Sequence, residues 1–147
     1  MSETSDLIKL YSGRILALAA DIPHLGRLEA PQASVRKRSP LCGSTVTVDL
    51  DMEDGRVSRF GQEVKACALG QASASVLGGA VIGRSAEELE HVAAQLEAML
   101  KSGGPVPEAP FEGFEALIPA RDFRNRHNSI LLAAQAAAEA ARLAEAG

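Results

Sequence analysis

Apolar and polar residues alternate most clearly over residues 45–52. The apolar members of this run are Val46, Val48, Leu50 and Met52, and Thr or Asp stands between them. A period of two predicts a strand with one buried and one solvent-facing side. Asp54-Gly55 follows and is typical of a hairpin turn, so we expect a returning strand over residues 56–65. The short basic stretch 33–40 is a candidate edge strand.

Helical spacing of apolar residues appears before and after this hairpin. The first predicted helix has Ser5 as its N-cap and an apolar stripe of Leu7, Ile8, Tyr11, Ile15 and Leu18. A helix rich in small residues should begin at Cys67 and end or loosen at Gly78, Gly79 and Gly83. Residues 85–100 open with a Ser85…Glu88 capping box. The polar stretch 111–128 should be irregular, and the final helix should start with Asn128 or Ser129 as its cap.

This order of elements predicts an α+β fold, with a small three-stranded antiparallel sheet and helices packed on one face. The 147 residues fit a single domain over residues 1–147. No apolar run of about 18 residues is present, so we expect no membrane span. The start of the chain lacks signal-peptide order, and we expect a cytoplasmic protein.

The composition argues against one class of function and limits the roles of the cysteines. Aromatic residues make up 3% of the chain and the net charge is −4, so we expect no binding of nucleic acid. Only two cysteines occur, and in the cytoplasm they do not form a disulfide framework. They are therefore either apolar filler in the core or residues for metal or redox chemistry.

The two cysteines flank the predicted hairpin. Cys42 precedes one strand and Cys67 follows the other, and in an antiparallel pair these positions lie at the same end of the sheet. A helix that begins after Cys67 would direct its positive end at the thiol and favour the reactive thiolate. The competing interpretation is that a cysteine in an Ala-rich stretch is a small buried apolar residue.

The segments "SPLCGS" (residues 39–44) and "ACALGQASASVLGGAVIGRSAEEL" (residues 66–89) resemble the U-type iron–sulfur cluster assembly scaffolds. This resemblance implies metal ligation by Cys42, Cys67 and His127. Ser44 stands where the family has Asp, and Asn128 stands where it has a third cysteine. The segment "LIPAR" (residues 117–121) is similar to one that family members offer to a chaperone.

Three functions remain open from these residues. The first is a scaffold-like protein, not an enzyme, that binds iron or a transient iron–sulfur cluster. It would accept sulfur from a cysteine desulfurase on Cys42 or Cys67 and pass the product to apo-proteins. A homodimer could bring four thiolates together. The second is a zinc-binding sulfur acceptor that stimulates a desulfurase. The third is an interaction module that has lost its metal site, in which His127 is an ordinary polar residue.

Overall fold

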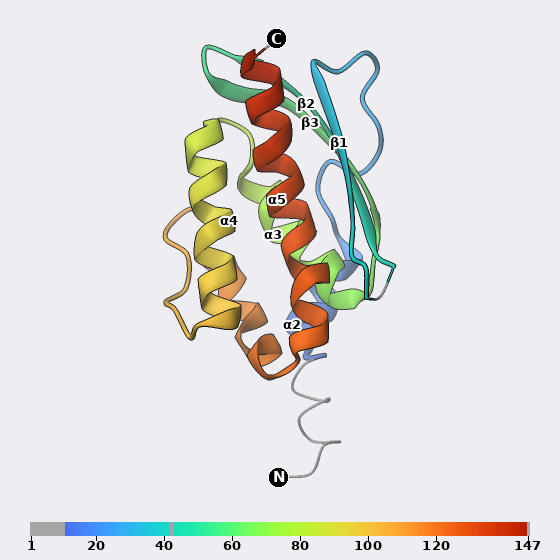
Figure 1. Cartoon of the computed structure of the whole chain (residues 1–147). Coiled ribbons are helices and arrows are strands. Elements are labelled where there is room, and N and C mark those ends of the chain that lie inside the picture. Colours follow the sequence, from blue (N-terminus) through green and yellow to red (C-terminus); the bar gives the residue numbers. More distant parts are fainter. Residues whose placement is uncertain (1–10, 42, 147) are drawn as a thin grey trace.

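The computed structural model describes residues 11–41 and 43–146. Three antiparallel strands form one sheet in the order β1-β2-β3. In chain order the elements are α2 (Gly13–Ala20), β1 (Ala33–Arg38), β2 (Thr45–Glu53), β3 (Arg56–Lys65), α3 (Ala68–Ala80), α4 (Ala86–Lys101), the 3-10 helix η1 (Glu112–Asp122) and α5 (Arg124–Ala146). The predicted α+β class is confirmed (Figure 1).

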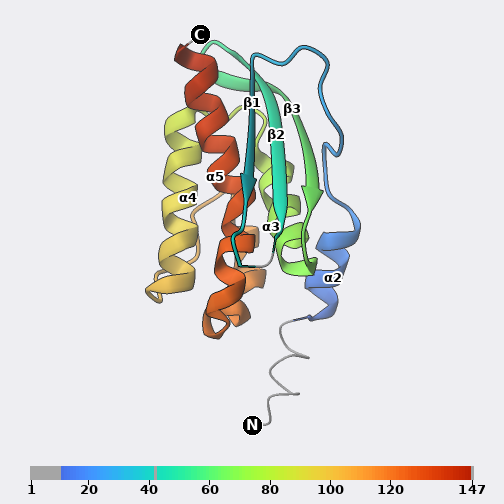
Figure 2. The ribbon, with the colours of Figure 1, turned by 45° about the vertical axis from the view of Figure 1, so that its right-hand side comes forward.

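The main helices lie on one side of the sheet. Helix α5 runs along the inner face, with α4 packed against its far side and α3 beside it (Figures 1 and 2). Alanines such as Ala133, Ala134 and Ala137 are buried in α5, and their small side chains let the helix approach both the sheet and its helical neighbours. No helix in the described part of the chain is long and apolar enough to cross a membrane.

The prediction of a solvent-facing side for the central strand is wrong. Thr45, Thr47 and Asp49 are all buried. The chain between α2 and β1 crosses the outer face of the sheet and covers Asp49, whereas Thr45 and Thr47 lie in a cavity lined by longer side chains such as Arg27 and Glu63. The backbone N–H of residue 26 donates to Gln62 O at 2.8 Å. A Cβ on Gly61 would lie 2.7 Å from the carbonyl oxygen of residue 26. The crossing segment therefore packs directly on β3.

One predicted helix start, that of α5, is corrected, and the predicted start of the first helix at Ser5 is not tested. Helix α2 begins after Ser12, whose Oγ accepts a hydrogen bond from Ile15 N at 3.4 Å; Ser5, Leu7 and Ile8 lie outside the described residues. Helix α5 begins at Arg124, so neither Asn128 nor Ser129 is its N-cap.

The prediction that the stretch before α5 is irregular is wrong. This stretch forms η1, in which Phe114 and Leu117 are fully buried. Polar residues are frequent in this stretch, so the sequence pattern did not reveal the apolar face of η1 that is buried. Helix α3 also continues through Gly78 and Gly79 to Ala80. Its buried packing outweighs the weak helix propensity of glycine.

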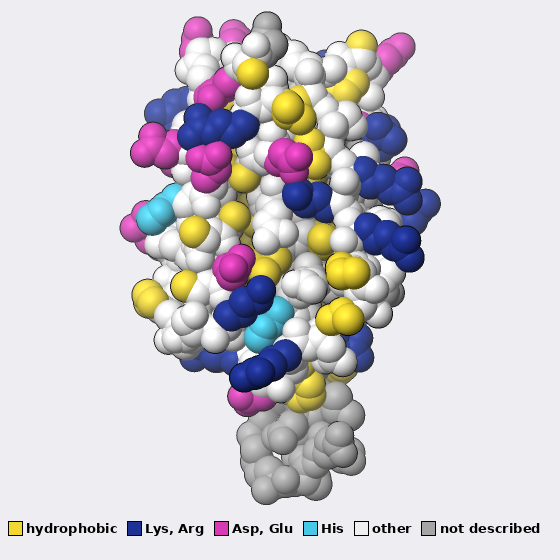
Figure 3. Space-filling view, in the orientation of Figure 1, with side chains coloured by type: hydrophobic (Ala, Val, Ile, Leu, Met, Phe, Trp, Pro, Cys, Tyr) yellow, Lys and Arg dark blue, Asp and Glu magenta, His cyan; other side chains and the backbone are white. Residues whose placement is uncertain are grey.

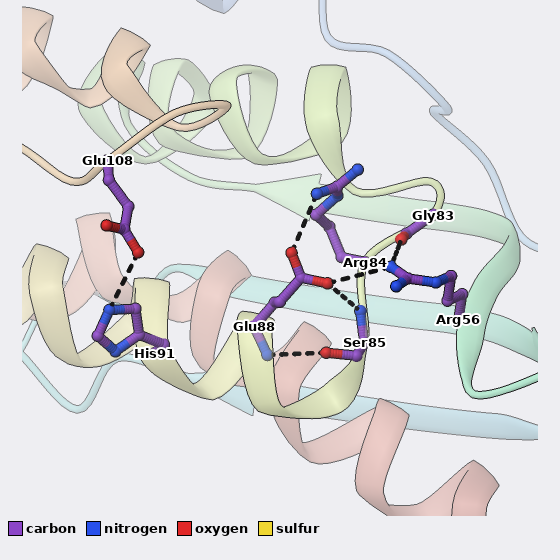
Figure 4. Close-up of polar contacts among 7 residues, drawn as sticks. All are labelled: Arg56, Gly83, Arg84, Ser85, Glu88, His91 and Glu108. Atoms are coloured by element: carbon purple, nitrogen blue, oxygen red, sulfur yellow. Dashed lines mark hydrogen bonds and ion pairs between the residues drawn. The ribbon is translucent and has the colours of Figure 1, made fainter.

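The predicted capping box of α4 is confirmed. Ser85 Oγ accepts a hydrogen bond from Glu88 N, and the Glu88 carboxylate accepts one from Ser85 N, both at 3.1 Å (Figure 4). The backbone hydrogen bond from Ser85 and the charge of Arg84 outweigh the effect of burial and lower the pKa of Glu88. One turn further along α4, His91 Nε2 lies 3.3 Å from Glu108 Oε1.

Candidate functional site

The thiol of Cys67 lies where three parts of the fold meet. Cys67 follows β3 and is the N-cap residue of α3, and it is half-buried. Its Sγ is 3.6 Å from Ser129 Oγ on α5. Ser129 donates in turn to Ser44 Oγ, just before β2, at 3.0 Å. The Ser129 hydroxyl therefore links the thiol of Cys67 to Ser44.

Close packing of α3 against α5 makes this contact. A Cβ on Gly70 would lie 2.8 Å from Ser129 Oγ and 2.8 Å from the Ala66 Cβ. Only glycine therefore fits at this point without a shift of the neighbouring atoms. A little further along the same interface, Ser73 Oγ donates to Ile130 O at 2.6 Å. These contacts fix the position of Ser129 relative to the thiol.

Cys42 lies outside the described residues, but its chain neighbours form a tight loop. Ser39 N donates to Ser44 O at 2.8 Å, and Gly43 N donates to Ser39 O at 3.0 Å. Gly43 has a φ of 72°, a conformation that favours glycine. Chain connectivity places Cys42 two residues before Ser44. The prediction that the two thiols are neighbours stays a prediction.

His127 is directed away from Cys67. It is buried, and its Nε2 lies 2.9 Å from Ala120 O and 3.1 Å from Arg121 O, both in η1. Since carbonyl oxygens only accept, Nε2 carries a proton in these contacts, and Nδ1 is the nitrogen that takes no part in them. Positions two apart on an α-helix differ by about 200°, so His127 and Ser129 project to opposite sides of α5. A ligand role for His127 stays a prediction that would require Nδ1.

Among the described residues, the donor groups linked at Cys67 are one thiol and two hydroxyl groups. In the part of the chain that the structure describes, no three His, Cys, Asp or Glu residues converge as a metal site would require. Sequence reasoning considered Asn128 as the substituted ligand position and missed Ser129. The only available signal was the small-residue pattern around Gly70, which allows α5 to approach the thiol.

The chain was compared with known proteins. The family model for the NifU-like N-terminal domain matches residues 10–114. The chain belongs to this family. A crystal structure of a nitrogen-fixing NifU-like protein (N-terminal) from Brucella abortus is 45% identical, with a TM-score of 0.92, and the match covers 96% of this chain and 98% of that one.

A more distant structure shares the fold at 20% identity and a TM-score of 0.80, covering 90% of this chain and 96% of the other. It is described as a putative iron–sulfur cluster assembly scaffold protein for the SUF system from Fervidobacterium islandicum. No match was found among curated proteins.

The segment expected to meet a chaperone is folded into η1. Leu117 is fully buried, and Arg121 donates to Met99 O at 2.7 Å and to Gly104 O at 2.6 Å. A partner that binds residues 117–121 as an extended peptide would first have to release these contacts.

Proposed function

We propose that this member of the NifU-like family takes part in iron–sulfur cluster assembly as a scaffold-like protein, with Cys42 and Cys67 as its thiolates. The observation that carries the proposal is the position of Cys67: a half-buried thiol at the N-terminus of α3, linked through Ser129 to Ser44. Membership of the family supports the same assignment. The iron or cluster is cargo, held through Cys67 and the loop that precedes Ser44.

The thiol of Cys67 also suits sulfur acceptance. In this step the Cys67 thiolate attacks the terminal sulfur of a persulfide on a cysteine desulfurase. A new S–S bond forms on Cys67, the S–S bond of the donor breaks, and the donor cysteine leaves as a thiolate, so no external oxidant or reductant is needed.

The neutral hydroxyls beside Cys67 favour temporary binding. Serine hydroxyls are weak ligands for iron in comparison with thiolates and carboxylates. Ser44 and Ser129 therefore leave coordination positions of the cargo open to sulfide, to a second copy of the chain or to the receiving apo-protein. A loosely held cluster is easier to transfer to a client, and the protein itself need not be an enzyme.

The test is the metal and acid-labile sulfide content of protein purified without oxygen and after reconstitution. We expect iron with sulfide in the native chain and a loss of both in Cys42→Ala and in Cys67→Ala. Ser73→Ala is the matched control, because it removes a buried hydroxyl from the α3–α5 interface without removing a thiol.

Zinc without sulfide would instead favour the sulfur-acceptor alternative, which predicts faster desulfurase turnover when the protein is added. Absence of metal after reconstitution, or unchanged iron and sulfide in both cysteine variants, would contradict the proposal.

A further inference from the structure

Two surface cavities lie on either side of the first turns of α5, and Asn128 lines both of them. One has a volume of about 860 Å³ and lies toward α4 and η1; the other has a volume of about 430 Å³ and lies toward β1. We call the two together the α5 groove. Its apolar lining includes Leu100, Phe123 and Leu132, and its charged lining consists of Arg36, Lys37, Arg38, Lys101, Arg121, Arg124 and Asp122.

The charge of the α5 groove is opposite to that of the whole protein. It contains six Lys or Arg residues and one Asp, although the chain carries a net charge of −4. Lys and Arg side chains line the β1 side and the lower part of the helices in Figure 3, where Asp and Glu are few. The groove is therefore a local concentration of positive charge on an acidic molecule.

Several of these cations have no ion-pair partner in the described part of the chain. Among the described residues, three of them make no ion pair and no hydrogen bond that would neutralise them: Arg38, Lys101 and Arg124. Arg36 also lines a cavity that contains Glu63 on the outer face of the sheet. At the opposite end of the sheet and helices, by contrast, arginines are paired with carboxylates, as in Arg59–Asp51 at 2.9 Å and Arg142–Glu90 at 2.7 Å. The unpaired charge is thus available to a partner.

The spacing of the cations indicates what kind of partner fits. They lie on both sides of α5, and a helix with its side chains is about 10–12 Å across, so one phosphate or carboxylate group cannot contact both sets. An extended peptide rises about 3.3 Å per residue and presents alternate side chains on one face. A segment with several Asp or Glu residues can therefore reach both cavities and place apolar atoms against the half-buried Phe123.

From this combination of shape and charge we propose that the α5 groove binds an acidic, extended segment of a partner protein. This goes beyond the proposed function, because it assigns a docking surface that does not depend on the thiols. Asn128 joins the two cavities, and its neighbour Ser129 contacts Cys67. A segment bound there lies along the same helix that touches the thiol.

Fluorescence anisotropy with a labelled peptide of about ten glutamates, which extends to about 33 Å, tests the proposal. We expect binding to the full chain that weakens when the salt rises from about 25 to about 250 mM, because screening shortens the reach of surface charges. The double variant Arg38→Glu/Arg124→Glu should lose at least about tenfold in affinity.

The matched control is Arg14→Glu/Lys65→Glu, which changes the net charge equally at exposed residues outside the groove and should lose less than about twofold. The variant Cys42→Ala/Cys67→Ala should bind the peptide with unchanged affinity. Peptide binding is thereby tested independently of metal binding by the two cysteines. Circular dichroism confirms that each variant is folded.

Three outcomes would overturn the proposal: no peptide binding at low salt, equal losses in the two charge variants, or tighter binding of an oligothymidine of the same length. The last would make the groove a nucleic-acid surface, which the scarcity of aromatic side chains disfavours.

Discussion

The carboxylate of Asp49 gives the sharpest test of how the fold is held together. Asp49 is completely buried in the central strand, and it accepts hydrogen bonds from Arg27 Nε at 2.7 Å, Ser34 Oγ at 2.6 Å and Leu28 N at 3.0 Å. Burial by itself raises the pKa of Asp49, but the hydrogen bonds from Arg27, Ser34 and Leu28 outweigh it, so the pKa lies below its ordinary value. The carboxylate thereby ties the crossing segment to the outer face of the sheet.

We expect Asp49→Ala to lower the free energy of unfolding by about 3 kcal/mol at neutral pH. Removing one partner of a buried ion pair typically costs about 3–5 kcal/mol. The lower end applies here because the Arg27 side chain is 51% exposed and regains water when the carboxylate is lost. For a chain of this size the melting temperature should fall by about 6–12 °C.

Urea unfolding between about pH 3 and pH 7 measures the effect. Because the pKa of Asp49 is lowered on folding, its stabilisation is present above the unfolded pKa of about 3.9 and is lost as the pH falls through the folded value. The stability gap between the native chain and Asp49→Ala should therefore narrow below about pH 4.

The control is Asp54→Asn in the β2–β3 turn, which should change stability by less than about 0.5 kcal/mol. A gap that stays constant down to about pH 3, or a loss below about 1 kcal/mol at pH 7, would show that Asp49 does not hold the segment in this way.

Four further substitutions probe the site and its supports. Gly70→Ala should destabilise by about 1 kcal/mol, since the overpacking against Ser129 exceeds the gain in helix propensity. Gly79→Ala, in the same helix with no atom within 4 Å, should stabilise by up to about 1 kcal/mol in thermal unfolding, and the reverse order would refute the packing argument. Ser85→Ala should cost about 1 kcal/mol by removing the capping box, with no change in metal content. Arg121→Met should cost about 2 kcal/mol and speed hydrogen exchange over residues 102–108, because it frees two carbonyl oxygens at the end of α4; unchanged exchange would contradict this role.

The sequence predicted well where the pattern is local. Three predictions came from residues close together in the chain: the hairpin strands over residues 45–52 and 56–65, the capping box at Ser85 and the helix beginning after Cys67. Each is confirmed, with β2 one residue longer than predicted. Period-two alternation, a turn pair and a capping pattern each involve only a few neighbouring residues, so their physics does not depend on the rest of the fold.

The errors have a common cause in long-range packing. The alternation in β2 predicted a solvent-facing side, but no local pattern could show that residues 24–28 would cover it and bury Asp49. The polar residues before α5 suggested a loop, although the helix begins at Arg124 with His127 bonded to η1. In the first case Leu28, 21 residues from Asp49 in sequence, covers the carboxylate. In the second, the buried packing of Phe114 and Leu117 forms η1, to which His127 bonds across only six or seven residues.

The same distinction applies to the candidate site. The sequence by itself determined that a thiol would stand at the start of a helix after the hairpin, and the substitutions at Ser44 and Asn128 were visible from the family resemblance. Only the tertiary structure decided that Ser129 is the residue of α5 that reaches Cys67, that His127 is turned to the opposite side, and that unpaired cations gather around Asn128. The physical reason is that the rotation and depth of α5 are set by close packing around Gly70 and along the alanines, which is a property of the assembled helices and sheet.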